Sequence, residues 1–87
     1  MEMDLKEEFE KASETVMNLS ERPSNEELLK LYSFYKQGTE GDVSGKRPGM
    51  INLKGRAKYD AWAKLEGMHA QEAQKNYVEL VANLLGK

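Results

Sequence analysis

The sequence has no cysteine, a single histidine and only two prolines among its 87 residues. Without cysteine it offers no disulfide framework, no thiolate nucleophile and no cysteine-based metal site. A catalytic site would need acid–base partners around His69, and we interpret this residue as an exposed polar side chain in the first turn of a helix. No serine follows the G-x-S-x-G pattern. We therefore predict no catalytic residue, no metal site, no cofactor and no enzyme activity.

Long apolar runs and an excess of positive charge are also missing. No apolar segment approaches the roughly 20 residues of a membrane span. The acidic start, Met1-Glu2-Met3-Asp4, lacks the apolar stretch of a signal peptide. The 13 basic and 15 acidic residues give a net charge of −2, which argues against a broad nucleic-acid surface. We expect a soluble, cytoplasmic protein without stable membrane insertion and without a nucleic-acid partner.

The sequence does contain apolar residues at intervals of three and four, which is the spacing of a helix face. This spacing predicts helices over residues 4–19, 24–37, 54–65 and 70–85. Ser24 and Glu27 have the spacing of a capping box at the start of the second helix, and Gly38 and Gly41 are expected to end that helix near Gln37. A chain of this length forms one domain. We expect residues 1–87 to form a single all-α domain and a monomer.

A long loop is expected between the second and third helices, over residues 38–53. Within it, Pro48-Gly49 suits the central positions of a type II turn. The stretch 41–47 resembles a phosphate loop, but it has three residues between its glycines instead of four and Arg47 follows its lysine, so we reject that interpretation. At about 3.3 Å per residue the loop can run back along the second helix. A four-helix up-down-down-up bundle is therefore permitted by the lengths, although they do not require it.

Aromatic and basic residues gather at two places in the predicted helices. Tyr32, Tyr35 and Lys36 share one face of the second helix. Lys54 and Lys58 lie one turn apart at the start of the third helix, where free N–H groups also favour anions. Two aromatic rings beside an ammonium form a platform for a base and a phosphate. If these two helices are parallel, their lysines can converge. From these residues alone, core tyrosines with solvated lysines, or a helical protein-interaction module that meets an acidic partner, remain open alternatives.

Three blocks of sequence occur in an informative order. They are Tyr32-Ser33-Phe34-Tyr35-Lys36-Gln37 followed by Gly41-Asp42, then Arg47-Pro48-Gly49-Met50, then Lys54-Gly55-Arg56-Ala57-Lys58-Tyr59-Asp60-Ala61-Trp62. In order and spacing they resemble the signature of the acyl-CoA-binding protein family, also called diazepam-binding inhibitor or endozepine. The resemblance extends from Phe9 to Leu84. It implies an up-down-down-up bundle that binds medium- to long-chain fatty acyl-CoA esters as an intracellular carrier and pool former, with acyl-CoA-using enzymes as candidate partners.

The resemblance also implies roles for individual residues. Tyr32, Lys36 and Lys58 match positions that hold the 3′-phosphate of CoA, and Lys54 matches another head-group contact. Tyr77 matches a tyrosine at the adenosine site, and Tyr35 matches a second tyrosine that lines the groove. For the remainder of the groove, which shelters the acyl chain, the expected residues are Met17, Leu28, Leu29, Ser33 and Phe34.

Two positions depart from the family pattern. Many members have lysine where this chain has Met17, so one phosphate contact of the family is in question here, and Met17 can offer apolar contact to the adenine or acyl region instead. In relatives the fourth helix often begins with a serine or threonine cap, where this chain has Met68-His69. The second departure concerns stability more than binding.

Overall fold

A computed structural model describes residues 3–86 of the chain. Met1, Glu2 and Lys87, which belong to the predicted acidic start and to the predicted domain, lie outside the described residues. Within the described part the chain forms the α-helices Leu5–Thr15 (α1), Asn25–Glu40 (α2), Leu53–Ala63 (α3) and Ala70–Leu85 (α4), with a 3-10 turn over Val16–Asn18 (η1). No strand occurs in residues 3–86. The predicted all-α fold is confirmed.

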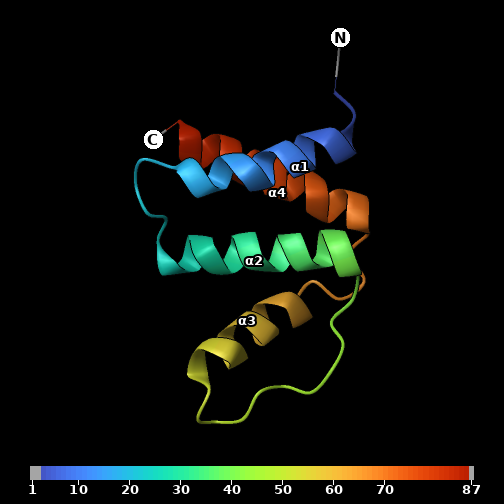
Figure 1. Cartoon of the computed structure of the whole chain (residues 1–87). Helices are drawn as coiled ribbons and strands as arrows, with labels where there is room; N and C mark the ends of the chain where they lie inside the picture. The colour runs from blue at the N-terminus through green and yellow to red at the C-terminus, as the bar shows by residue number, and fades with distance from the viewer. Residues whose placement is uncertain (1–2, 87) are drawn as a thin grey trace.

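The direction of each helix follows from the chain path in Figure 1. Helix α2 runs opposite to α1, α3 runs in the same direction as α2, and α4 returns in the direction of α1. Helix α2 contacts α3 on one side and α4 on the other, while α1 packs against α4. The up-down-down-up order is therefore present, and the long loop makes it possible by running back along α2 and α3 (Figure 1).

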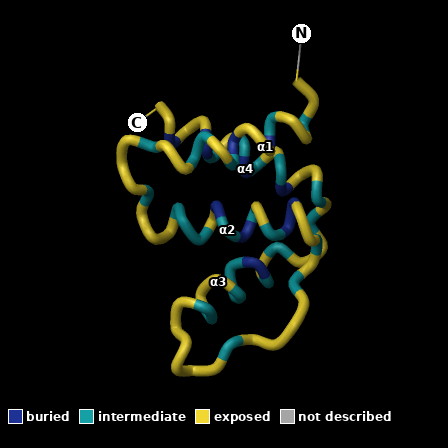
Figure 2. The backbone as a smooth tube through the Cα atoms, viewed as in Figure 1, coloured by how far each residue is buried: buried dark blue, intermediate teal, exposed yellow. Residues whose placement is uncertain are grey.

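The main core lies between α1, α2 and α4. Its buried members are Phe9, Ala12, Leu31, Tyr77, Val81 and Leu84. Figure 2 shows the buried segments of these three helices facing one another, whereas most of α3 and the loop is exposed or half-buried. On α3 only Trp62, among the described residues, is a buried hydrophobic side chain. Helix α3 is therefore held against α2 outside the main core.

The helix starts are fixed by side-chain caps. Asp4 Oδ1 accepts the N–H of Glu7 at 2.8 Å before α1. At α2 the predicted capping box is confirmed, with Ser24 and Glu27 each accepting the other's backbone N–H at 3.1 and 2.9 Å. A side-chain cap stabilises a helix by about 1 kcal/mol. His69 is the N-cap residue of α4, one position before the predicted first turn, and its side chain makes no cap hydrogen bond.

The predicted end of the second helix near residue 37 is wrong. Helix α2 continues through Gly38 to Glu40, and Gly41 follows it with φ of 82°. Gly38 lies where α1 and α4 approach α2, because a Cβ atom there would be 2.9 Å from Gln74 Cγ and 3.3 Å from Phe9 Cζ. This glycine therefore allows close helix packing, and Gly41 takes the backbone conformation that ends the helix.

The predicted type II turn at Pro48-Gly49 is also wrong. That turn needs a positive φ at Gly49, and the described glycines with positive φ are Gly41, Gly45 and Gly67. The turn instead lies two residues later, where the N–H of Asn52 donates to the carbonyl of Gly49 at 3.1 Å. Met50 and Ile51 therefore occupy its central positions. The loop covers residues 41–52, which is shorter at both ends than predicted.

The loop is fastened to α3 by side chains. Arg47 donates to both carboxylate oxygens of Asp60, at 2.8 and 2.7 Å, and the Tyr59 hydroxyl donates to the carbonyl of Gly45 at 3.1 Å. Trp62 Nε1 donates to the carbonyl of Gly41 at 2.8 Å. These bonds account for an irregular segment of this length in a small domain, since each one ties the loop to the helix that follows it.

A second set of bonds joins the start of the loop and the α3–α4 connection to α2. Gln37 is fully buried, and its amide donates to Asp42 Oδ1 at 2.9 Å and to the carbonyl of Met68 at 2.8 Å. The same Asp42 oxygen accepts the N–H of Gly67 at 2.8 Å. The start of the loop and the α3–α4 connection are thus anchored on one buried amide.

None of the described helices has the length and apolar character of a membrane span.

Candidate ligand-binding site

A groove of about 720 Å³ lies between α2 and α3, and we call it the α2–α3 groove. Its lining residues are Arg22, Asn25, Leu28, Leu29, Tyr32, Leu53, Lys54, Ala57 and Lys58. The leucines and Ala57 supply apolar walls, and the charged members are all basic. Sites for small organic ligands typically have volumes of about 300–1,000 Å³ and a mostly apolar lining with a few polar groups. The groove fits a ligand that combines an apolar part with negative charge.

Helix geometry explains why these side chains meet. Leu28, Leu29 and Tyr32 lie within about one turn on the face of α2 that α3 approaches. On α3, Lys54, Ala57 and Lys58 follow at the intervals of a single helix face. Ala57 is small and leaves space between the two helices. The lysines are near the start of α3, where free backbone N–H groups add to the attraction for an anion.

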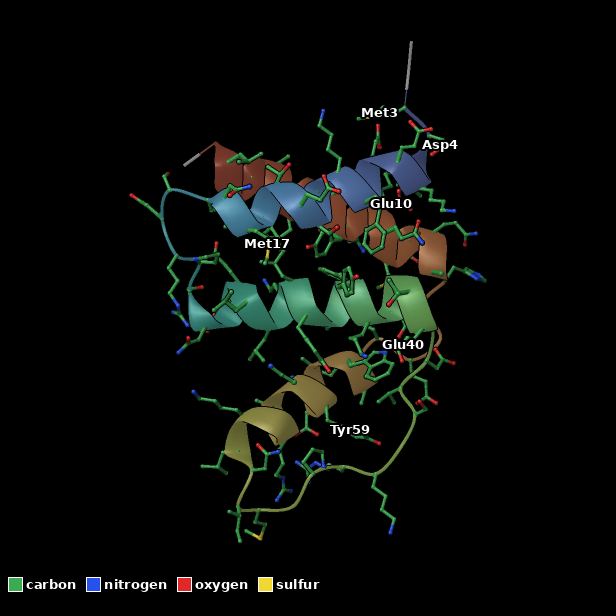
Figure 3. The ribbon with its side chains drawn as sticks, in the orientation of Figure 1. Met3, Asp4, Glu10, Met17, Glu40 and Tyr59 are labelled. Carbon is green, nitrogen blue, oxygen red and sulfur yellow. The ribbon has the colours of Figure 1, made fainter. Side chains whose placement is uncertain are left out.

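A second hollow, of about 440 Å³, lies between α1, α2 and α4, and we call it the tyrosine hollow. Its lining residues are Ser13, Glu14, Val16, Met17, Leu31, Tyr32, Tyr35 and Tyr77. Met17 is 82% exposed and extends from η1, which follows α1, toward α2 (Figure 3). Tyr32 lines both the groove and the hollow. The two spaces therefore adjoin at the Tyr32 ring.

An aromatic cluster supports the tyrosine hollow. The Tyr77 ring centroid lies 5.1 Å from that of Phe9, edge to face, and 5.8 Å from that of Tyr35. Phe9 and Tyr35 are 5.5 Å apart. Burial raises the pKa of Tyr77, and the neighbouring Tyr35 raises it further. Tyr77 is therefore a protonated hydrogen-bond donor at neutral pH, held in place by its neighbours.

Two lysines lie over aromatic rings at the contact between α2 and α3. Lys58 Nζ is 5.3 Å from the centroid of Tyr32, and Lys36 Nζ is 5.0 Å from the centroid of Trp62. Both distances are within the range of cation–π attraction. Lys36 follows Tyr32 by one turn, and Trp62 follows Lys58 by one turn, which is about 5.4 Å along each helix. The parallel helices thus bring Lys36 and Lys58 to one boundary.

Lys36 has a partner on its own helix. It forms an ion pair with Glu40, one turn further along α2, and both side chains are partly exposed. The hydrogen bond to Glu40 raises the pKa of Lys36, against the opposing effect of desolvation. Figure 3 labels Glu40 near the end of α2 that adjoins the loop. The Lys36 ammonium is fully charged at neutral pH, and it contacts both the Trp62 ring and the Glu40 carboxylate.

The structure places the other predicted residues as follows. Lys54, Leu28 and Leu29 line the α2–α3 groove. Ser33 is buried and its hydroxyl donates to the carbonyl of Lys30 at 3.0 Å, and Phe34 packs against the main core. Ser33 and Phe34 are not among the residues that line the groove or the tyrosine hollow.

Arg22 and Ala57 line the groove but were not identified from the sequence. Arg22 precedes α2 and stands outside any helical pattern, so no periodicity marks it. Ala57 was identified only as part of an apolar face. Its role in leaving space depends on the position of α2 beside α3. The positive charge of Arg22 close to the start of α2 was a usable signal. The sequence does not indicate, however, which surface the Arg22 side chain faces.

A third hollow, of about 680 Å³, shares Ser13 and Tyr35 with the tyrosine hollow. It is lined by Asp4, Leu5, Lys6, Phe9, Glu10, Ser13, Tyr35, Gly38, Thr39, Gln71 and Gln74. Asp4 and Glu10, which Figure 3 labels, place two carboxylates at this hollow with one lysine. Two carboxylates against one lysine leave an excess of negative charge that repels an anion, so the hollow is unsuited to phosphates. Across residues 3–86 no group of three or more acidic, histidine or cysteine side chains is arranged to hold a metal ion.

Comparisons with known proteins identify the family. The family described as acyl-CoA-binding protein matches residues 6–81. The chain is 51% identical over 79 residues to acyl-CoA-binding protein homolog 1 of Caenorhabditis elegans, covering 91% of this chain and 92% of that protein. It is 47% identical over 85 residues to the acyl-CoA-binding protein of Ricinus communis, covering 98% and 94%. The crystal structure of Oryza sativa acyl-CoA-binding protein 2 is similar to it with a TM-score of 0.90 at 46% identity, over 94% of this chain and 89% of that one. This chain therefore belongs to the acyl-CoA-binding protein family.

Proposed function

We propose that residues 1–87 form a single domain that binds medium- to long-chain fatty acyl-CoA esters and serves as an intracellular carrier and pool former. The observation that carries this proposal is the junction at Tyr32, where an apolar groove with a basic rim meets a hollow lined by aromatic rings. A fatty acyl-CoA has three matching parts, which are a hydrocarbon chain, phosphates and an adenine ring. We propose a cytoplasmic monomer that needs no cofactor.

The head group is assigned to the residues around Tyr32. The adenine ring fits the tyrosine hollow, where Tyr32 and Tyr35 offer ring surfaces and Met17 offers an adaptable apolar contact. The 3′-phosphate is assigned to Lys58 and Lys36, and the other phosphates to Lys54. Each charge-assisted hydrogen bond contributes about 1.5–3 kcal/mol net. These contacts would select a CoA ester over a free fatty acid.

The acyl chain is assigned to the α2–α3 groove. Leu28, Leu29 and Ala57 provide its apolar surface. Burial of one methylene contributes about 0.8 kcal/mol, so a sixteen-carbon chain supplies roughly 10 kcal/mol as an upper bound. The open groove covers only part of each methylene, and the actual gain is smaller. The tail contribution is still comparable to that of several phosphate contacts, and it would set the chain-length preference.

The chemistry of the groove supports carriage without reaction. Its titratable lining residues are Arg22, Tyr32, Lys54 and Lys58, and none of its lining residues within the described chain is acidic. Hydrolysis of the thioester would need a general base placed beside a water molecule, and the described lining of the groove offers no carboxylate or imidazole for that role. We propose that the thioester stays intact and that acyl-CoA-using enzymes receive it.

Calorimetric titration with palmitoyl-CoA, CoA and palmitate tests the proposal. Because head and tail both contribute, palmitoyl-CoA is expected to bind at least about a hundredfold more tightly than CoA, and palmitate hardly at all. Equal affinity for palmitate and palmitoyl-CoA would show a fatty-acid carrier instead. Native mass spectrometry of the purified protein adds a second measurement, since a species that stays empty in the presence of palmitoyl-CoA would favour a protein-interaction module.

A further inference from the structure

Three large apolar side chains project from the turn that precedes α3. Met50 is 80% exposed, Ile51 is fully exposed and Leu53 is 73% exposed. We call these three residues the apolar turn. The bond from Asn52 N–H to the Gly49 carbonyl closes the turn, and Asn52 Oδ1 accepts the N–H of Gly55 at 3.0 Å. The apolar turn is thus a fixed projection, and exposed apolar patches of this kind mark interaction sites.

Positive charge surrounds the apolar turn. Residues 43–59 contain five basic side chains and no acidic one, whereas the remaining sequence holds eight basic and all fifteen acidic side chains. The five are Lys46, Arg47, Lys54, Arg56 and Lys58. One of them, Arg47, is paired with Asp60. The protein as a whole is acidic, so its attraction for a negatively charged surface is concentrated on residues 43–59. These residues form the loop and the start of α3, at one corner of the fold (Figure 1).

The apolar turn is continuous with the α2–α3 groove. Leu53 belongs to the turn and also lines the groove, together with Leu28, Leu29 and Ala57. A surface that covers the turn would therefore lie at one mouth of the groove. If the acyl chain occupies the groove, as proposed above, it could pass between groove and surface with little exposure of its methylenes to water.

We propose that the apolar turn docks reversibly on a lipid bilayer that contains anionic lipids. Met50 and Ile51 would enter the headgroup region while the surrounding lysines and arginines face lipid phosphates and carboxylates. A lipid surface is favoured over a protein partner because Met50 and Ile51 are at least 80% exposed and line neither the groove nor the tyrosine hollow, which suits a deformable medium that closes around each side chain. An apolar contact plus neighbouring basic residues is the combination that holds peripheral proteins at anionic membranes. The attachment is to the surface and involves no spanning segment.

Vesicle co-sedimentation of the ligand-free full chain tests this docking. Two kinds of vesicle are compared, phosphatidylcholine alone and phosphatidylcholine with about one third phosphatidylserine. The wild type is expected to sediment with the anionic vesicles only, and less so at high salt. The double variant Met50→Ser with Ile51→Ser is expected to bind them at least about tenfold more weakly. The matched control is Leu85→Ser, which removes an exposed apolar side chain at the end of α4.

The readout separates this proposal from acyl-CoA binding. Met50 and Ile51 line neither the groove nor the tyrosine hollow, so the double variant is expected to bind palmitoyl-CoA in vesicle-free solution as the wild type does. Equal sedimentation of the wild type and the double variant would overturn the docking, as would equal binding to both kinds of vesicle. A wild type that ignores vesicles, combined with a variant that slows ligand transfer to an acyl-CoA-using enzyme, would identify a protein partner and overturn the lipid proposal.

Discussion

Lys58 Nζ lies 5.3 Å from the centroid of the Tyr32 ring and so connects the third helix to the second across the groove. The ammonium remains accessible at the point where the α2–α3 groove and the tyrosine hollow adjoin, because Lys58 is an exposed residue. A phosphate at this point would meet a cation while an attached ring system reaches the hollow. This contact places a cation, the apolar wall of the α2–α3 groove and the aromatic rings of the tyrosine hollow beside one another.

Lys58→Ala and Lys36→Ala are each expected to weaken palmitoyl-CoA binding at least about tenfold, because each removes a charge-assisted contact and every 1.4 kcal/mol is one decade in affinity. The matched control is Lys75→Ala, which removes an exposed lysine from α4. Calorimetry measures the affinity, and circular dichroism checks that the helices remain. Wild-type affinity in both variants would remove the phosphate assignment.

Glu40→Gln is expected to strengthen binding about twofold. In the ligand-free protein Glu40 holds the Lys36 ammonium, and a phosphate must compete for it. An exposed pair at this helical spacing contributes only about 0.3–0.5 kcal/mol, so the gain is small and greatest at low salt. Titrations at two salt concentrations measure it, with Glu79→Gln on α4 as the control for loss of one negative charge. Weaker binding by Glu40→Gln would mean that the carboxylate assists the site.

Met17→Lys is expected to tighten binding of CoA and palmitoyl-CoA by several fold. Met17 is exposed at the edge of the tyrosine hollow, so a lysine there can reach a phosphate without disturbing the core. Glu14 lines the same hollow and will offset part of the gain. Leu85→Lys adds the same charge at another exposed apolar position. If both variants gain equally, the effect is one of net charge and the hollow does not hold the head group.

Stability is expected to fall in acid because two carboxylates are bound in the folded state. The Gly67 N–H, followed by the Gln37 amide, lowers the pKa of Asp42, and Arg47 lowers the pKa of Asp60. A carboxylate whose folded pKa lies below its unfolded value of about 3.9 stabilises the protein fully above that value and loses this contribution as the pH falls through the folded pKa.

Urea midpoints are therefore expected to be steady from about pH 7 to 5 and to drop below about pH 4. The variant Asp42→Asn with Asp60→Asn should be less stable at neutral pH and should show a shallower acid decline. Glu10→Gln, at an exposed carboxylate of α1, serves as the control. An unchanged acid profile in the double variant would contradict the assignment of these two groups.

The sequence predicted the four helices well, since apolar spacing and the Ser24–Glu27 capping box are local signals. Their up-down-down-up order was implied by the family resemblance, because the loop length only permitted it. Gly38 was misjudged because the same residue type ends helices and permits close packing, and only the approach of Phe9 and Gln74 distinguishes the two uses. Gln37 had no predicted role beyond its place in the motif. Its amide donates to Asp42 and to the carbonyl of Met68. The contact to Met68 spans 31 residues, and a contact over that separation leaves no periodic pattern in the sequence.

The candidate site was predictable to a different degree at each position. Tyr32, Lys36 and Lys58 were identified from helical spacing and a family resemblance, and their approach depends on parallel helices that the loop length only permitted. Arg22 was missed because its place beside the groove follows from the path of the chain before α2. The exposed apolar turn was missed because the expected turn lay elsewhere, and Met50 and Ile51 then carried no distinguishing pattern.

Intermolecular nuclear Overhauser effects between bound palmitoyl-CoA and the protein test the central claim most directly. The acyl methylenes are expected to give contacts to the methyl groups of Leu28, Leu29 and Ala57, while the adenine protons contact the rings of Tyr32 and Tyr35. Acyl contacts to Leu5 and Phe9 in the third hollow, with none to the α2–α3 groove, would contradict the account.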